Sequence, residues 1–124
     1  MEWAIKGDLP IYSQLVDQVK QAIVAGVFQP GERLASVRDM AAEAGVNPNT
    51  MQRALQELER EGMVFSQRTS GRYVTEDRAA IDGVRKLLAG ERIKSFLSAM
   101  KKLGYNLNEI VSLIKETVEE DKDE

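Results

Sequence analysis

The stretch from residue 34 to residue 74, LASVRDMAAEAGVNPNTMQRALQELEREGMVFSQRTSGRYV, limits most strongly what this chain can fold into. Ser36 is placed to cap a short helix, with an acidic residue three positions later as in a capping box. Gly45 is placed to end that helix in the left-handed conformation. Asn47 and Pro48 suit the N-cap and first position of a second helix. A short helix, a glycine turn and a second helix form the helix-turn-helix pattern.

The residues after the second helix predict a β-hairpin. Residues 63–67 and 72–75 are β-prone, and the tetrapeptide RTSG at residues 68–71 joins them. A two-stranded hairpin is marginal in water, so it needs the helices or a third strand for support. We expect residues 3–5, Trp-Ala-Ile, to supply that strand. The predicted fold is mainly α-helical with a small β-hairpin wing, a winged helix-turn-helix.

From about residue 77 the sequence changes to helical patterns. Gly90 separates two apolar stripes and is expected to mark a kink or a change of helical phase, and Asn106 is placed to cap a further helix. These patterns predict a division into a winged helix-turn-helix domain, residues 1–75, and a tail of two helices, residues 76–124.

The two amphipathic tail helices cannot bury all their apolar side chains against each other. They need the winged domain or a second copy of the chain, and a symmetric homodimer is the commonest solution. An apolar stripe of this kind is more often a core or an interface than a ligand pocket. The predicted dimer interface consists of Ile93, Phe96, Leu97, Met100, Ile110, Val111 and Ile114.

The sequence contains neither cysteine nor histidine. Disulfides, thiolate zinc sites and catalysis by Ser-His-Asp or Cys-His groups are therefore excluded. We expect no metal site and no cofactor, and an enzyme or ligand carrier is disfavoured. The chain lacks an apolar run long enough to span a membrane, and its N-terminus lacks the pattern of a signal peptide. A cytoplasmic protein without membrane association is expected.

In a helix-turn-helix motif the second helix enters the DNA major groove and its first residues contact bases. The net charge of −3 is unusual for such a role, but residues 1–75 are almost neutral, with eight basic and nine acidic residues. The affinity for DNA depends on local contacts with phosphates, so the total charge of the chain does not decide whether it binds DNA. The predicted DNA-binding residues are Ser36, Arg38, Asn47, Pro48, Asn49, Thr50, Gln52, Arg53, Arg68, Gly71 and Arg72.

Several of these residues also have a purely structural interpretation. Arg38 could pair with a neighbouring carboxylate, and Asn47 could serve only as a helix cap. Arg68 and Arg72 could simply be solvated on a hairpin. Asn49 and Gln52 have no role in the core, and a side-chain amide can read adenine with two hydrogen bonds. Thr50 is expected to contact a phosphate or a thymine methyl group.

Residues 10–74 resemble the winged helix-turn-helix of GntR-type bacterial transcription regulators. The motifs PIY-x-Q, G-x-x-x-PG-x-x-L, S-x-R, GV-x-x-x-T and L-x-x-EG occur here in the family's order. The resemblance implies that Arg38 contacts DNA from the helix before the recognition helix and that residues 47–52 read bases and phosphates. It also implies that Gly71 lets the wing backbone approach DNA closely. The short tail is similar to that of the YtrA subfamily, in which the tail serves dimerisation.

The sequence departs from the family pattern at two places. Ala35 stands where the family usually has proline. The wing reads RTSGRYV where the family is usually close to RGKGTFV, so Ser70 and Arg72 replace lysine and threonine.

These observations predict a homodimeric transcription repressor that binds a palindromic double-stranded DNA operator. The subfamily resemblance implies control of an operon that contains transporter genes. A small-molecule effector of unknown identity is a further expected partner. The alternative is a winged module for protein–protein assembly that does not bind DNA directly.

Overall fold

The computed structural model describes residues 1–122 of the 124-residue chain. Its contacts divide the chain into two compact units, Met1–Arg85 and Lys86–Glu124. The division falls inside a helix, after the position at which the sequence analysis divides the chain. The domain boundary after residue 75 stays a prediction. The first unit is called the winged unit below, and the second is called the tail unit.

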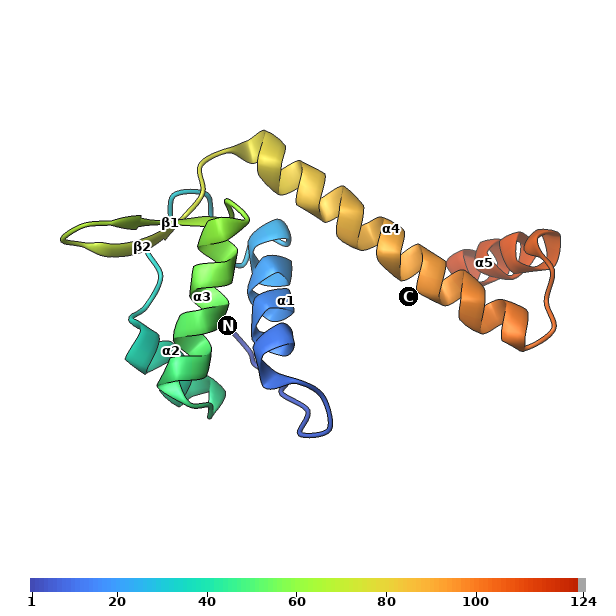
Figure 1. The fold of residues 1–124 in the computed structure, drawn as a ribbon. Coiled ribbons are helices and arrows are strands. Elements are labelled where there is room, and N and C mark those ends of the chain that lie inside the picture. The colour runs from blue at the N-terminus through green and yellow to red at the C-terminus, as the bar shows by residue number, and fades with distance from the viewer. Residues whose placement is uncertain (123–124) are drawn as a thin grey trace. The chain divides into compact units, whose positions relative to one another are not determined.

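Three helices and a hairpin make up most of the winged unit (Figure 1). The predicted helix-turn-helix and the predicted wing are both present, so the predicted fold class is confirmed. The elements are α1, Ile11–Val24; α2, Val37–Ala44; α3, Pro48–Arg60; β1, Val64–Gln67; and β2, Gly71–Val74.

Local capping explains where the helices of the helix-turn-helix begin and end. The Ser36 hydroxyl accepts a hydrogen bond from the Asp39 amide at 3.1 Å, and Gly45 ends α2 with a φ of 71°. The Asn47 side-chain oxygen accepts from the Asn49 amide at 2.8 Å, which satisfies one free donor at the start of α3. The three caps predicted from sequence are therefore confirmed.

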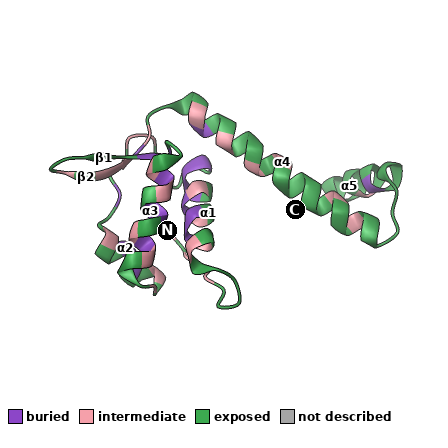
Figure 2. Ribbon diagram, in the orientation of Figure 1, coloured by how far each residue is buried: buried purple, intermediate pink, exposed green. Residues whose placement is uncertain are grey.

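The core of the winged unit lies between α1 and α3, whose facing sides carry the buried residues (Figure 2). Apolar residues spaced three and four apart place one buried stripe on each helix. Removing these side chains from water is the main source of stability for a domain of this size. The buried residues at the centre of this core are Leu15, Val19, Ile23, Met51, Ala54, Leu55 and Leu58.

The wing takes its third strand-like partner from a different segment than the one predicted. β1 and β2 pair antiparallel, and the outer edge of β2 bonds to residues 31–34. The Leu34 amide donates to the Arg72 carbonyl at 2.9 Å, and the Val74 amide donates to the Glu32 carbonyl at 2.8 Å. The prediction that residues 3–5 supply this strand is wrong. The Ala4 backbone is held instead by the side-chain amide of Gln18 on α1, at 2.9 and 2.8 Å.

The fourth helix, α4, spans Arg78–Lys102 and begins in the winged unit. Ile81 is buried there, and the Arg85 guanidinium donates to the Val24 carbonyl at 3.0 and 2.8 Å. This contact satisfies a free carbonyl at the C-terminal end of α1. α4 continues as one helix through Gly90, and the kink or change of helical phase expected there stays a prediction.

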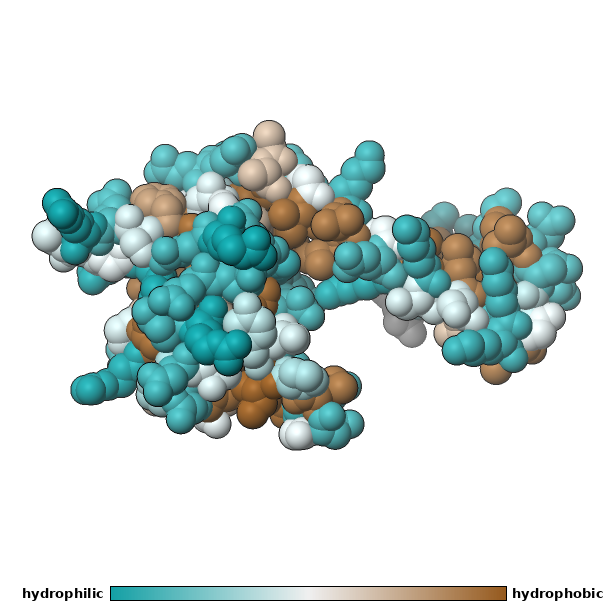
Figure 3. Space-filling model, in the orientation of Figure 1, coloured by the Kyte–Doolittle hydropathy of each residue, from teal (hydrophilic) through white to brown (hydrophobic). Residues whose placement is uncertain are grey.

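The tail unit consists of the rest of α4 and α5, Leu107–Asp121. α5 begins with a full capping box, because Asn106 and Glu109 exchange hydrogen bonds of 2.9 Å between side chain and backbone. Within residues 86–122 Ile110 is the one residue that is fully buried. Several apolar side chains of this unit reach the surface, as the brown atoms over α4 and α5 show (Figure 3).

Among the helices of residues 1–122, none combines the length and the apolar character that a membrane span requires.

Candidate nucleic-acid interface

The N-terminal half of α3 presents a polar face opposite its buried stripe. Pro48, Asn49 and Arg53 are exposed, whereas Thr50 and Gln52 are half-buried. Asn47, at the N-cap, is exposed as well. Helix starts expose free backbone N–H groups and carry a partial positive charge, which favours a nearby phosphate. This end of α3 therefore offers amide side chains and backbone donors on an accessible surface.

Arg38 and Arg68 are the two predicted DNA-binding arginines that remain free. Both are exposed, one on α2 and the other at the wing tip between β1 and β2. Within residues 1–122 neither side chain makes an ion pair, so the predicted alternative that Arg38 pairs with a carboxylate is not observed. Two unpaired guanidinium groups are suited to phosphate contacts.

Arg53 lies against a residue that the sequence analysis did not single out. Its guanidinium carbon sits over the ring of Tyr12 on α1, 4.9 Å from the ring centroid. The same Tyr12 donates from its hydroxyl to Glu57 on α3 at 3.4 Å. A cation–π contact of this kind holds an exposed arginine in one region of space without neutralising its charge.

Arg72 is held by two side chains of α3 rather than left solvated. Its Nε donates to Glu59 Oε1 at 2.5 Å, and its Nη1 donates to Gln52 Oε1 at 3.2 Å. Ser66, which lies opposite Arg72 in the hairpin register, also donates to Glu59 at 2.5 Å. The inner face of the wing is thereby tied to α3.

The charge of Glu59 is stabilised by these partners. Burial raises the pKa of this carboxyl, but the hydrogen bonds from Ser66 and Arg72 and the positive charge of Arg72 outweigh it, so its pKa lies below the usual value. The carboxylate stays ionised, and the ion pair persists at neutral pH.

The other acidic residues at the C-terminal end of α3 are also paired with basic ones. Glu57 accepts from Arg60, and this hydrogen bond is the main reason that the pKa of Glu57 is lowered. Glu61 pairs with Lys20 of α1 at 2.5 Å. Because each carboxylate has a cationic partner, the acidic end of α3 repels a nearby polyanion less than its sequence suggests.

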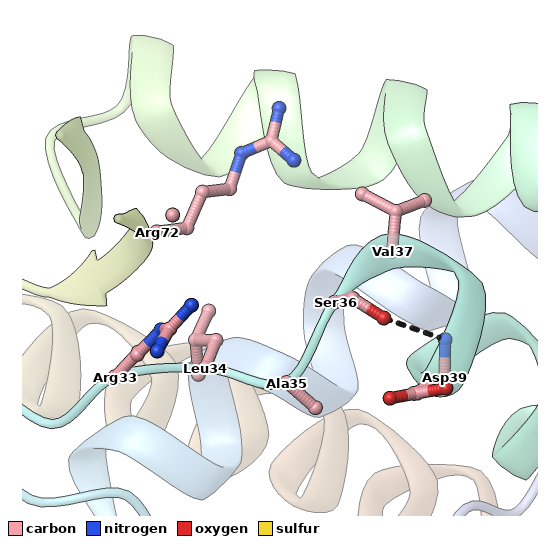
Figure 4. A pocket seen from close by; sticks show the side chains of 8 residues that line it. Arg33, Leu34, Ala35, Ser36, Val37, Asp39 and Arg72 are labelled. Carbon is pink, nitrogen blue, oxygen red and sulfur yellow. Dashed lines mark hydrogen bonds between the residues drawn. The ribbon is translucent and has the colours of Figure 1, made fainter. Parts of the chain in front are cut away.

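The segment before α2, the start of α2 and the wing meet at one surface depression. It is lined by residues 33–37, Asp39, Gly71 and Arg72 (Figure 4). The structure thus brings the predicted residues Ser36, Gly71 and Arg72 together. In Figure 4 the Arg72 side chain extends toward α3, whereas Arg33 lies along the segment before α2.

Arg33 is a candidate that sequence reasoning missed. Its backbone bridges to Tyr73 of β2, and a Cβ added at Gly71 would lie 3.4 Å from its Nε. Gly71 has a φ of 111°, a conformation that favours glycine. The one hint in the sequence was that a basic residue, Arg33, directly precedes the apolar Leu34. No sequence pattern indicated that this segment lies beside the wing.

The predicted interface residues of the tail unit separate into three groups by exposure. Ile110 is fully buried within the single chain, so its assignment to a dimer interface is wrong. Ile93, Phe96, Val111 and Ile114 are exposed, whereas Leu97 and Met100 are half-buried.

The structure combines a recognition helix whose polar N-terminal end is accessible, a helix that precedes it, and a wing that is bonded to it. These features define a winged helix-turn-helix DNA-binding protein. The family model described as bacterial regulatory proteins, gntR family, matches residues 11–74. The chain belongs to the GntR family of bacterial regulatory proteins. Its members are transcription regulators rather than enzymes.

Two curated relatives match nearly the whole chain. The uncharacterized HTH-type transcriptional regulator YhcF of Bacillus subtilis strain 168 is 36% identical over 93% of this chain and 95% of its own length. The HTH-type transcriptional repressor YtrA of the same strain is 33% identical over 90% of this chain and 86% of its own length.

A solved structure supports the same assignment. A GntR family transcriptional regulator from Listeria monocytogenes is 37% identical, with a TM-score of 0.84, over 90% of this chain and 98% of that chain. The similarity covers the tail as well as the winged helix-turn-helix.

Proposed function

We propose that this protein is a homodimeric, cytoplasmic transcription repressor that binds a palindromic operator in double-stranded DNA. The observation that carries the proposal is the exposed polar start of α3, together with two exposed arginines that make no ion pair within residues 1–122, Arg38 of α2 and Arg68 of the wing tip. The start of α3 reads bases in a major groove, and the arginines contact phosphates.

The assignment of roles follows the exposure of each side chain. Asn49 and Gln52 contact base edges, and Thr50 contacts a phosphate or a thymine methyl group. Asn47 and Pro48 set the start of α3 and contact the sugar-phosphate backbone of the DNA, and Arg53 adds a positive charge on the same helix. Ser36 at the N-cap of α2 and Arg38 within α2 contact the DNA backbone. Gly71 lets the wing approach the DNA closely.

Dimerisation follows from the surface of the tail unit. Ile93, Phe96, Val111 and Ile114 leave an apolar surface that a second copy of the chain covers. Two winged units then meet two half-sites about one helical turn apart, roughly 34–36 Å. The similarity to YtrA over 90% of this chain supports repression, because that relative is named a repressor. Control of an operon with transporter genes stays a prediction. A small-molecule effector stays a prediction.

The test is a selection of binding sites from a random DNA duplex pool with the purified protein, followed by titration of the selected site at several salt concentrations. We expect a palindromic consensus and a steep loss of affinity with salt, because phosphate contacts release counterions. A folded dimer that selects no sequence would overturn the operator proposal and favour the protein-assembly alternative.

A further inference from the structure

Arg72 differs from the other predicted DNA-binding arginines in how it is held. Its side chain is 16% exposed and donates to both Glu59 and Gln52, whereas Arg38 and Arg68 are exposed and free of ion pairs within residues 1–122. Moving Arg72 toward a phosphate would break its hydrogen bonds to both Glu59 and Gln52 and leave the half-buried Glu59 carboxylate without its cation. Arg72 is therefore poorly placed to contact DNA itself.

We propose that Arg72 is a positioning residue that orients the side-chain amide of Gln52 and thereby sets which base Gln52 can read. The inference rests on the proposed function, because it concerns how an operator is recognised. It revises the sequence-based prediction that Arg72 is itself a DNA contact.

The orientation of the Gln52 amide follows from the chemistry of its partner. An arginine guanidinium carries only hydrogen-bond donors, so the group that faces it must be an acceptor. The Gln52 carbonyl oxygen accepts from Arg72 Nη1 at 3.2 Å. The amide NH₂ group, which is a donor, is then the end that remains for DNA.

The position of Arg72 is itself fixed from two sides. Its Nε donates to Glu59, two helical turns along α3 from Gln52, and Ser66 donates to the same Glu59 oxygen. β1 and β2 pair Ser66 with Arg72, so the hairpin register sets both donors against one carboxylate. The guanidinium thus has a defined place from which it holds Gln52.

An amide held in this way reads a base as a donor. Guanine N7 and O6, thymine O4 and adenine N7 are acceptors in the major groove, whereas cytosine presents a donor. Reading adenine with two hydrogen bonds needs the amide oxygen as well as the nitrogen at one base edge, and here the oxygen faces Arg72. We expect the base that Gln52 faces to be guanine or thymine rather than adenine, because the N7 acceptor of adenine lies beside the N6 amino donor, which an amide NH₂ group cannot satisfy.

Binding-site selection with Arg72→Met tests the proposal. Methionine keeps an unbranched side chain but removes every donor, so the Gln52 amide is free to turn. We expect the base preference at one position of each half-site to change about two- to tenfold, as for one hydrogen bond, while the other positions keep theirs. Adenine should gain at that position. In a Gln52→Ala background, Arg72→Met should leave base preference unaltered.

Arg68→Met is the matched control, because it removes an exposed wing arginine that does not touch Gln52. It should lower affinity equally for all sequences. Arg72→Lys keeps a positive charge beside Glu59 but lacks the second arm of the guanidinium. It should shift the same position as Arg72→Met, and it serves as the test if Arg72→Met does not fold.

Two outcomes count against the inference and are distinguishable. A wild-type consensus that stays the same at every position in the folded Arg72 variants overturns the positioning role alone. The absence of any consensus for the wild-type protein overturns the proposed operator binding, and the inference with it.

Discussion

The winged unit and the tail unit bury their apolar side chains to different degrees. In the winged unit α1, α3 and the wing share a core in which Leu15, Met51 and Leu58 are fully buried. In the tail unit Ile93 and Leu103 are 57% and 72% exposed. A single chain therefore completes the DNA-binding domain, whereas the tail leaves apolar surface uncovered. The comparison shows that the winged unit buries its apolar core within one chain, whereas the tail unit exposes an apolar surface of the kind that binds a partner.

The largest effect is expected from a cavity in the winged core. Leu58→Ala should lower the free energy of unfolding by about 2–5 kcal/mol, because a fully buried leucine is removed from a closely packed site. Urea unfolding at a fixed protein concentration measures the change. The control is Gln56→Ala, on the exposed side of the same helix, which should change stability by less than about 0.5 kcal/mol. Equal effects of the two substitutions would contradict the described core.

A charge in the apolar surface of the tail unit should have the next largest effect, on self-association. Phe96→Asp is expected to weaken dimerisation about a hundredfold or more, since an unpaired carboxylate would be buried between the two copies. Sedimentation velocity measures it, and near-wild-type circular dichroism shows that the chain remains folded. Ser95→Asp places the same charge at the neighbouring exposed residue and should leave the dimer intact. A Phe96→Asp protein that still dimerises would show that the interface lies elsewhere.

The DNA-binding surface of the winged unit should respond to the loss of a free arginine. Arg38→Ala is expected to weaken operator binding by about 1–3 kcal/mol and to reduce the salt dependence, because a phosphate contact is lost. Fluorescence anisotropy with the selected duplex measures both quantities. Arg78→Ala removes an exposed arginine outside the predicted DNA-binding set and serves as the control. Unchanged affinity in a folded Arg38→Ala dimer would remove this residue from the site.

The smallest effect should come from the ion pair that holds the wing. The folded-state pKa of Glu59 is lowered from its usual 4.5, so the stabilisation by this carboxylate is present above that value and is lost as the pH falls through the folded-state pKa. The pair is partly solvated and should contribute less than about 1 kcal/mol. Thermal unfolding from pH 6 to pH 3 should show a smaller acid-dependent loss for Glu59→Gln than for wild type. Glu116→Gln, at an exposed position of α5, should follow the wild-type curve.

Features that depend on near neighbours in the chain were predictable. Ser36, Gly45 and Asn47 each act on backbone groups one turn away or less, so their residue types alone indicated the helix boundaries. The buried stripe of α3 followed from helical spacing. Motif order was sufficient to identify the GntR family, which its family model confirms.

Features that join distant segments were not predictable in the same way. The support of the wing by residues 31–34 depends on how the chain returns beside β2. Residues 3–5 have the more strand-like composition, so composition alone indicated the wrong segment. Periodicity placed Ile110 on an apolar stripe but did not distinguish the inner edge of the stripe from the outer one.

The sequence by itself determined the helix caps, the apolar stripes, the winged helix-turn-helix pattern and the absence of cysteine and histidine chemistry, because these depend on residue type and short spacing. Only the tertiary structure decided that Arg72 donates hydrogen bonds to Glu59 and Gln52 and that Arg53 lies over the ring of Tyr12. Those contacts join residues that are well separated in the chain. An arginine that the sequence places on the surface can be solvated or bonded to other side chains. Which of the two occurs depends on the side chains that the folded backbone brings within hydrogen-bond distance.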